Sequence, residues 1–529
     1  MTSPPPFPLP TPDQINHLRA YIQDTWRVLT RSQVHLLAAA QDPKVEYHPQ
    51  RPWIIYISQR ENFQQVQASL AQSLTAAELS QIDLKILPAE IDNLQEHGLL
   101  YLPQEYVVPG GRFNELYGWD SYFIVLGLLR DGEYALAHSM VALLIYEIEH
   151  YGTVLNGNRT YMLNRSHPPL LTPMIRAVFR ARPDLEWLHS LLPAVERYYS
   201  YWTVPPHLNP ATGLSHYHAL GHGPAPEVLA SEKDDQGQTH YDRVRAYYQQ
   251  HPVTAYDVRL YYDAEADKLT DLFYQGDRSM RESGFDISDR FGPFSVDIIH
   301  YAPVCLNSLL YQMEQDIAWM HRQVKHLDQV AYWEDQGSRR QHLVNQFLWD
   351  EAAGQYFDYN FRSGHRRPYK FATTFMPLWA GLASQAQAQR VAQNLVHFEA
   401  PGGLLTSTHV SGNQWDAPFG WAPLQFFAVQ GLTRYGYHPE AHRLAAKFVH
   451  LVSAEFGRTG NIFEKYDVER CSAQVSDEIL FGYSSNEIGF GWTNGVILEF
   501  LALLGLFEAK DPDPVALQRH QGGSETKDQ

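Results

Sequence analysis

Apolar residues recur at helical spacing along most of this chain. Within residues 13–40, Leu18, Ile22 and Trp26 fall on one face of a predicted helix. Comparable amphipathic or buried stretches follow between residues 120 and 505, and many are bounded by Gly, Pro or Asp, as is typical of helix ends. The predicted helices are Tyr122–Leu129, Tyr134–Tyr151, Pro173–Arg180, Leu188–Tyr201, Ser308–Leu327, Tyr332–Leu348, Ser384–His397, Pro423–Tyr435, His438–Phe456 and Thr493–Leu506.

The order of these helices predicts an all-α fold class. Helix pairs that repeat about six times cannot each bury an apolar face alone, so they are expected to close around a shared axis as an αα-barrel. Trp53–Ile57 and residues 82–87 predict strands in a mixed layer ahead of this domain. Leu348–Asn360 predicts a β-hairpin over the rim.

We predict four segments along the chain. Residues 1–12 are a disordered, proline-rich lead-in, and residues 13–108 are a helical and mixed N-terminal extension. Residues 109–508 form the large helical domain, and residues 509–529 are a flexible polar tail. Within the large domain, residues 229–268 are a polar, tyrosine-rich insertion, either a solvated surface loop, which we favour, or a lid over a pocket.

Composition and charge narrow the classes of function. With 529 residues, 44% of them apolar, the chain can bury a large core. Its net charge of −18 disfavours nucleic acid and anionic membranes as partners. The N-terminus has no basic or apolar region of a signal peptide, and no run of about 18 apolar residues occurs. We expect a cytoplasmic protein whose two cysteines, Cys305 and Cys471, are reduced.

The most informative stretch is Pro109–Tyr122, which reads Pro-Gly-Gly-Arg-Phe-Asn-Glu-Leu-Tyr-Gly-Trp-Asp-Ser-Tyr. A buried helix would not mix charges and aromatic rings so densely, because unpaired buried charges are costly. A sugar site would, since the apolar faces of a pyranose stack on rings while Arg and carboxylates bond to its hydroxyls. We therefore interpret this stretch as part of a carbohydrate site.

Pro109–Tyr122 also resembles the first signature of the trehalase family of glycoside hydrolases. Residues 414–423, Gln-Trp-Asp-Ala-Pro-Phe-Gly-Trp-Ala-Pro, resemble the second signature. Weaker matches follow the family's order at residues 156–169, at 282–290, and at 463–467 together with 489–496. The resemblance implies an (α/α)6 toroid and an enzyme that hydrolyses an α-glucoside with inversion at the anomeric carbon.

The resemblance also implies the two catalytic carboxyl groups. Glycoside hydrolysis needs one protonated carboxyl group to assist the leaving oxygen and one ionised group. Asp286 matches the family's general acid, and Phe285 stands beside it where the family has Trp. Glu464 matches the general base, which activates a water on the opposite face of the sugar. A surface ion pair with Lys465 is the alternative interpretation of Glu464.

Contacts to the substrate carry over from the same resemblance. Arg and Asp side chains suit the bidentate binding of hydroxyls on a neutral sugar. The expected substrate-binding residues are Arg112, Phe113, Trp119, Asp120, Asn156, Arg165, His167, Glu227, Trp415 and Asp416.

The second half of the expected pocket departs from the family. Two arginines of the family segment Arg-Pro-Arg-Pro-Glu-Ser are Gly223 and Ala225 here. A family Gln is His167, and the acidic residue before Gly-Phe-Gly-Trp is Ile488. The family's Asn-Arg-Tyr-Trp is Ser-His-Tyr-His at residues 215–218. A site that loses polar partners of a second glucose binds that glucose poorly, so we favour a smaller aglycone.

We expect glucose release from a small soluble α-glucoside, an osmolyte of the glucosylglycerol type. An α,α-trehalase is the main alternative. A glucosylglycerate hydrolase, whose carboxylate would meet His167, His216 or His218, is a further one. An inactive sugar-binding toroid would not need both carboxylates, and a polysaccharide hydrolase or lyase would need an open groove. No motif indicates a nucleophilic Ser or Cys, a metal site or a cofactor, and the oligomeric state is not predicted.

Overall fold

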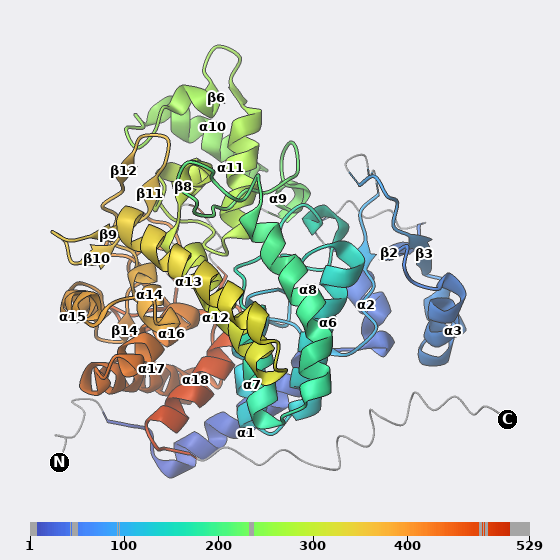
Figure 1. Cartoon of the computed structure of the whole chain (residues 1–529). Coiled ribbons are helices and arrows are strands. Elements are labelled where there is room, and N and C mark those ends of the chain that lie inside the picture. Colours follow the sequence, from blue (N-terminus) through green and yellow to red (C-terminus); the bar gives the residue numbers. More distant parts are fainter. Residues whose placement is uncertain are drawn as a thin grey trace.

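Six helices form the inner ring of a closed toroid in this computed structural model (Figure 1). Each inner helix contacts the next along the chain, and the last packs against the first. The expected (α/α)6 toroid is therefore confirmed. The structure describes residues 8–42, 44, 51–91, 94, 96–231, 237–475, 479, 481 and 485–507. The inner helices are α5 (Asp120–Arg130), α7 (Leu171–Ala181), α12 (Val304–Gln323), α14 (Met376–Ala380), α16 (Ala422–Arg434) and α18 (Gly491–Leu503).

A second layer of helices surrounds this ring. α6 packs on α5, α8 on α7, α13 on α12 and α17 on α16. α1 lies against α17 and α18, because Leu18, Ile22 and Trp26 on one of its faces are buried in the core of the toroid. Part of the predicted N-terminal extension thus completes the outer layer. The outer helices are α1 (Pro12–Leu29), α6 (Tyr134–Tyr151), α8 (Leu185–Thr203), α13 (Leu327–Phe347), α15 (Gln385–Asn394) and α17 (His438–Thr459).

A small parallel sheet stands beside the toroid, at the right in Figure 1. Its strand order is β3-β2-β4, with β2 (Trp53–Ile57), β3 (Ile82–Ile86) and β4 (Leu99–Leu100). α3 (Phe63–Ser73) and α4 (Ala76–Leu79) connect the first two strands, as parallel pairing requires. Ile55, Val66 and Leu70 belong to a core separate from that of the toroid. The strands predicted in this region are confirmed.

Shorter elements lie between the helices of the toroid. α10 (His240–Gln250), α11 (Asp271–Glu282) and the short strands around them gather at one end, at the top of Figure 1. The remaining elements are α2 (Leu36–Ala40), α9 (Pro226–Ser231), β1 (Thr30–Arg31), β5 (Tyr106–Val107), β6 (Tyr262–Asp263), β7 (Lys268–Leu269), β8 (Tyr301–Ala302), β9 (Trp349–Asp350), β10 (Gln355–Tyr356), β11 (Tyr359–Asn360), β12 (His365–Arg366), β13 (Glu399–Ala400), β14 (Gly403–Leu404), β15 (Phe419–Trp421), β16 (Lys465–Asp467) and the 3-10 helices Gln33–His35, Thr160–Met162, Val258–Leu260, Pro293–His300, Ala372–Phe375 and Leu395–His397.

Outside the long helices, some of the sequence predictions are confirmed and others stay predictions. β9 and β10 pair as the predicted rim hairpin. The stretch 229–268 contains α10 and the paired strands β6 and β7, and the hydroxyl of Tyr241 donates to the buried Asp277 of α11 at 2.9 Å. This stretch is therefore packed on the domain where it is described, and the lid remains a prediction. Residues 1–7 of the lead-in and the whole tail lie outside the described residues.

Among the residues that the structure describes, no helix combines the length and the apolar character needed to cross a membrane.

Candidate active site

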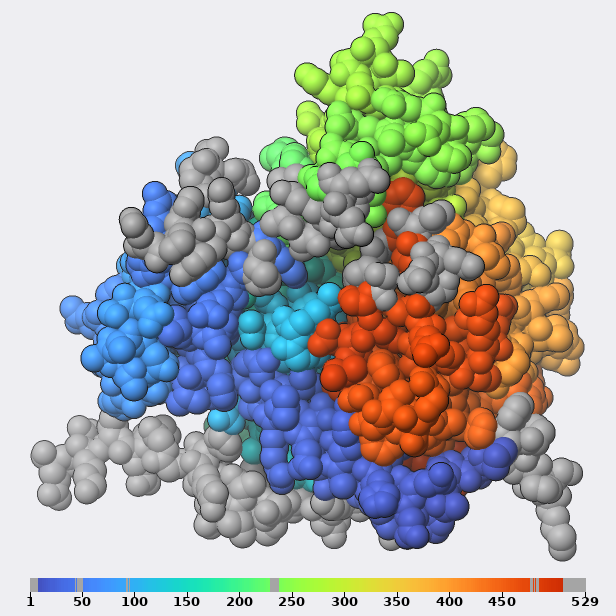
Figure 2. All heavy atoms as spheres, turned by 180° about the vertical axis from the view of Figure 1, so that it is seen from behind, coloured from blue at the N-terminus to red at the C-terminus, as the bar shows by residue number. Residues whose placement is uncertain are grey.

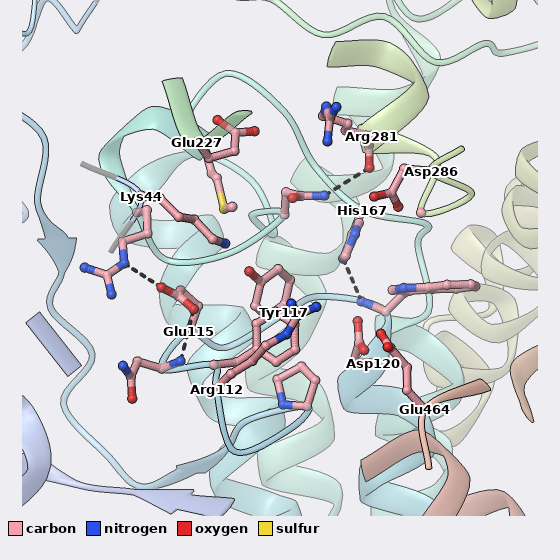
Figure 3. Close-up of a pocket in the computed structure, with 18 of the residues that line it drawn as sticks. Lys44, Arg112, Glu115, Tyr117, Asp120, His167, Glu227, Arg281, Asp286 and Glu464 are labelled. Atoms are coloured by element: carbon pink, nitrogen blue, oxygen red, sulfur yellow. Dashed lines mark hydrogen bonds and ion pairs between the residues drawn. The ribbon is translucent and has the colours of Figure 1, made fainter. Parts of the chain in front are cut away.

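A cavity of about 330 Å³ lies where the inner helices begin. Its wall combines segments that are far apart in sequence, which meet around a hollow on the face shown in Figure 2. Figure 3 shows the side chains of this wall. Those among the expected site residues are Arg112, Phe113, Trp119, Asp120, Asn156, Arg165, His167, Glu227, Asp286, Trp415 and Glu464.

Asp286 enters the cavity from the loop that follows α11 (Figure 3). Gly284 turns this loop with φ of +74°, and a Cβ there would lie 3.0 Å from the ring of Trp119. A glycine is therefore needed both for the backbone conformation and for the close approach. The side-chain amide of Gln414 donates to the carbonyl of Asp286. The loop is thus held from two sides, and the carboxyl group is half-buried at the cavity wall.

Glu464 enters from the residue before β16, which pairs with β15. Its backbone N–H donates to the carbonyl of Glu487 at 2.9 Å, and its carbonyl accepts from the indole of Trp492 at 3.0 Å. The Nζ of Lys465 lies 3.9 Å from Glu464 Oε2, and both side chains are buried. Burial lowers the pKa of Lys465 to about 8, although Glu464 opposes this shift. The pair is therefore internal, and the alternative of a surface ion pair is wrong.

Asp120, the first residue of α5, lies close to both of these carboxyl groups. Burial raises its pKa well above the usual range, and the charges of Glu464 and Asp286 raise it further. Like charges in one buried site disfavour simultaneous ionisation. The site therefore favours protonated Asp120, in which form it can donate a hydrogen bond to a sugar hydroxyl.

Aromatic rings form one side of the cavity. Trp119 lies with its ring centroid 6.1 Å from that of Trp415 and 5.8 Å from that of Trp492. Trp415 stacks on Trp421 at 4.0 Å, and Phe285 packs edge-on against both Trp119 and Trp415. Because these rings fix one another, they offer a rigid apolar surface of the kind that sugar rings contact.

Polar groups lie on the remaining sides. Arg165 pairs with Glu227, and both are buried. Its Nε and Nη1 find no hydrogen-bond partner in the described parts of the chain. Buried donors of this kind are normally satisfied, so these two fit sugar hydroxyls. Asn156 donates to the carbonyl of Arg281 at 3.3 Å. Burial lowers the pKa of His167 to about 3, with a further contribution from Arg165.

The mouth of the cavity carries an ion pair that joins the first signature to the segment just before the Gly-Phe-Gly-Trp motif. Arg112 and Glu487 approach to 3.5 Å, and the Arg112 backbone N–H donates to Glu487 Oε1 at 3.1 Å. The guanidinium also lies over the ring of Phe113. Glu487 was not predicted, because its neighbour Ile488 occupies the position that matches the family. Ile488 is half exposed and does not line the cavity.

Asp416 stands apart from the other expected site residues, because it does not line the cavity. Its carboxylate accepts from the hydroxyls of Ser407, Ser411 and Tyr369 at 2.6–2.8 Å and from the backbone N–H of Asp289 at 2.9 Å. Burial raises its pKa to about 6, against the effect of these bonds. We therefore assign Asp416 to holding the loops of Asp286 and Trp415 together.

Two carboxyl groups at one aromatic-lined cavity, those of Asp286 and Glu464, are what glycoside hydrolysis requires. The family model named Trehalase matches residues 13–505. This chain belongs to the trehalase family. It is therefore an inverting glycoside hydrolase, as the sequence resemblance implied.

Known relatives agree with this membership. A cytosolic neutral trehalase of Neurospora crassa is 37% identical, over 91% of this chain and 72% of the relative. One from Kluyveromyces lactis is 35% identical, over 89% and 69%. The structure of neutral trehalase Nth1 from Saccharomyces cerevisiae has a TM-score of 0.78 and 32% identity over 96% of each chain. A GH63 mannosylglycerate hydrolase from Thermus thermophilus, with a TM-score of 0.51 and 18% identity, shares the fold alone.

The cavity also contains charged residues that were not predicted from the sequence. Arg281 lines it next to Asp286 and bonds to Asp277 on the preceding turn of α11 at 3.3 Å. Glu115 lies in the first signature, and its ion pair with the buried Arg159 at 2.7 Å holds that signature in place. The position of Arg281 within Arg-Glu-Ser-Gly-Phe-Asp was the available signal. Further lining residues that were not expected are Gln41, Asp42, Lys44, Tyr117, Met162, Phe490 and Trp492.

Two of the departures from the family pattern, Ala225 and Ile488, lie outside the lining of the cavity. Ala225 is fully buried and does not line the cavity. Arg281 lines the cavity from α11, on the side where Glu227 lies (Figure 3). Ile488 does not line the cavity either, and its neighbour Glu487 is the ion-pair partner of Arg112. These two departures from the family pattern therefore give no support to a smaller aglycone.

No group of three or more His, Cys, Asp or Glu side chains is arranged to hold a metal ion, as far as the described residues extend.

Proposed function

We propose that this protein hydrolyses α,α-trehalose to two molecules of glucose. The observation that carries the proposal is the cavity in which Asp286 and Glu464 face one sugar site and Arg281 and Glu227 extend it beyond Asp286. The trehalase names of its relatives support the same substrate. The proposal replaces the glucosylglycerol-type substrate that the sequence favoured.

Asp286 acts as the general acid in this proposal. It gives its proton to the glycosidic oxygen as the bond from that oxygen to the anomeric carbon breaks. Glu464 removes a proton from a water whose oxygen bonds to the anomeric carbon from the opposite face. Asp286 ends ionised and Glu464 protonated, and exchange with solvent restores both groups. The Nζ of buried Lys465 lies 3.9 Å from Glu464 Oε2, so its charge faces the proposed base.

The remaining polar groups position the two sugars. Arg112, Arg165 and Asp120 hold the hydroxyls of the glucose that is attacked. Trp119 and Trp415 contact its apolar face. The leaving glucose must lie next to Asp286, which protonates its oxygen. Arg281 and Glu227 are on that side and supply the charge-assisted hydrogen bonds of a second sugar. The glycerol of a glucosylglycerol keeps two free hydroxyls where the second glucose of trehalose keeps four, so it can form fewer of these bonds.

The histidines give no support to a glucosylglycerate substrate. Burial lowers the pKa of His167 and of His216 to about 3, and it also lowers the pKa of His218. These rings are therefore neutral near pH 7 and provide no positive charge for a carboxylate. His216 and His218 also lie outside the lining of the cavity.

We propose that hydrolysis takes place in the cytosol. The relatives from Neurospora crassa and Kluyveromyces lactis are named cytosolic enzymes. The sequence expectation of a cytoplasmic protein agrees with these names. A small neutral sugar is the expected partner, and no nucleic acid is expected at a net charge of −18.

Substrate preference tests the proposal directly. Glucose release is measured under identical conditions from trehalose, glucosylglycerol and glucosylglycerate. We expect kcat/KM for trehalose to exceed the other two values by at least about tenfold, because only trehalose fills both halves of the cavity. A higher kcat/KM for glucosylglycerol would refute trehalose as the substrate while leaving the assignment of the two carboxyl groups intact.

A further inference from the structure

A second cavity, of about 430 Å³, lies inside the ring of inner helices. All six inner helices contribute side chains to it, so it lies on the axis of the toroid; we call it the axial cavity. Its lining residues are Tyr122 and Leu126 of α5, Pro173, Arg176, Ala177 and Arg180 of α7, Gln312 of α12, Trp379 of α14, Phe426, Gln430, Thr433 and Arg434 of α16, and Glu499 of α18.

The axial cavity is separate from the catalytic cavity. On α18, Trp492 lines the catalytic cavity and Glu499 the axial one, a difference of seven residues or about 10 Å along the helix. Arg434 ends α16, and Arg180 lies in the last turn of α7. The axial cavity therefore opens toward the ends of the inner helices that point away from the catalytic groups. The two cavities share no lining residue.

The charge of the two linings differs. The catalytic cavity has six carboxyl groups and five basic side chains, which suits a neutral sugar. The axial cavity has three arginines and one carboxylate in a protein of net charge −18. Glu499 is neutralised by Arg130 at 2.6 Å, and Arg176 is neutralised by Asp316 at 2.6 Å. Two positive charges therefore remain, on Arg180 and Arg434.

The partial negative charge at helix C-termini explains the positions of only some of these arginines. The C-terminal end of a helix carries partial negative charge that attracts cations, and Arg434 Nη1 donates to the carbonyl of Trp379 at 2.7 Å. Arg180 forms no hydrogen bond or ion pair with any described residue. The Nε of Arg176 is buried, and among those same residues it too has no hydrogen-bond partner. Several guanidinium donors thus remain for an anion.

Aromatic rings and amide groups form the floor of the axial cavity, whereas the arginines lie at its rim. The ring of Tyr122 contacts those of Trp379 and Phe426 edge-on, and all three residues line the cavity. Gln312 and Gln430 add amide groups beside them. Rings and amides together suit a sugar ring, whereas guanidinium groups suit a phosphate through paired hydrogen bonds.

We propose that the axial cavity binds a phosphate-bearing small molecule, with Arg180 and Arg434 holding the phosphate. A phosphorylated hexose would also use the aromatic floor, whereas free phosphate would use the arginines alone. The site is independent of the catalytic cavity and of the identity of its substrate.

Calorimetric titration of the full-length protein tests this site, with glucose 6-phosphate, inorganic phosphate and glucose as probes at constant ionic strength. We expect glucose 6-phosphate to bind and Arg180→Gln to weaken its binding by at least about tenfold, since one charge-assisted contact is lost. Arg458→Gln removes an exposed arginine from the last turn of α17 and should leave binding unchanged.

The probes distinguish the sources of the phosphate group. Tighter binding of glucose 6-phosphate than of inorganic phosphate assigns the site to a sugar phosphate, and equal binding assigns it to the free anion. Because Arg434 also bonds to α14, Arg180→Gln is the decisive variant and Arg434→Gln only supports it. Equal affinity of the wild-type protein and Arg180→Gln for glucose 6-phosphate, or binding of neither phosphate, would overturn the proposal without affecting the proposed trehalose hydrolysis.

Discussion

Asp286→Asn and Glu464→Gln are each expected to lower kcat for trehalose by about a thousandfold, because each removes one half of the acid–base pair. The two variants should differ with α-glucosyl fluoride, whose leaving fluoride needs no proton. Asp286→Asn should recover most of its activity on this substrate, since only the acid step is lost. Glu464→Gln should stay inactive, since water must still be activated. Initial rates with both substrates provide the measurement.

Matched controls separate chemistry from folding. Asp289→Asn changes a residue in the loop of Asp286 that does not line the cavity. Glu469→Gln changes an exposed residue close to Glu464 in the sequence. Both should keep activity within about tenfold of the wild type, because neither side chain lines the cavity. Equal recovery of Asp286→Asn and Glu464→Gln on the fluoride would contradict the division of roles, as would activity near the wild-type level in either variant.

Arg281→Ala is expected to lower kcat/KM for trehalose by roughly 10- to 150-fold, which corresponds to the loss of a charged hydrogen bond of about 1.5–3 kcal/mol. Hydrolysis of α-glucosyl fluoride should change much less, because this substrate has no second sugar to contact Arg281. The comparison of kcat/KM for the two substrates therefore reports on the leaving-group side of the cavity alone.

An exposed arginine provides the control for this second prediction. Arg259→Ala removes a charge whose side chain is 86% exposed and should leave both substrates unaffected. If Arg281→Ala lowers kcat/KM equally for trehalose and for the fluoride, Arg281 acts on the catalytic groups or on folding. The assignment of the second sugar to its side of the cavity would then be wrong.

Much of the fold follows from helical periodicity, but the closure of the toroid does not. Tyr134–Tyr151 was predicted to the residue because its apolar positions are regular and Gly152 ends it in the left-handed conformation. α14 was not predicted, because five residues that are buried all round show no amphipathic pattern. α1 was assigned to a separate extension, since a sequence pattern identifies an apolar face but not its partner.

The candidate site, too, was predicted from the sequence only in part. Residues inside dense motifs, such as Trp119 and Glu464, were found because their neighbours match a known signature. Arg281 was missed because it lies in the last turn of α11, whereas the family's arginines match the segment around Ala225. Asp416 was placed in the pocket although its carboxylate is used by three hydroxyls and a backbone N–H. Motif position thus identifies a residue's segment, whereas its contacts decide its role.

The anomeric form of the first products tests the central claim most directly. Inverting hydrolysis of α,α-trehalose converts the attacked glucose to the β-anomer and releases the other glucose as the α-anomer. Proton NMR during the first minutes, before mutarotation, should therefore show α- and β-glucose in equal amounts. Release of α-glucose alone would show retention and contradict the roles of Asp286 and Glu464, and the absence of any glucose from trehalose would contradict the proposed function itself.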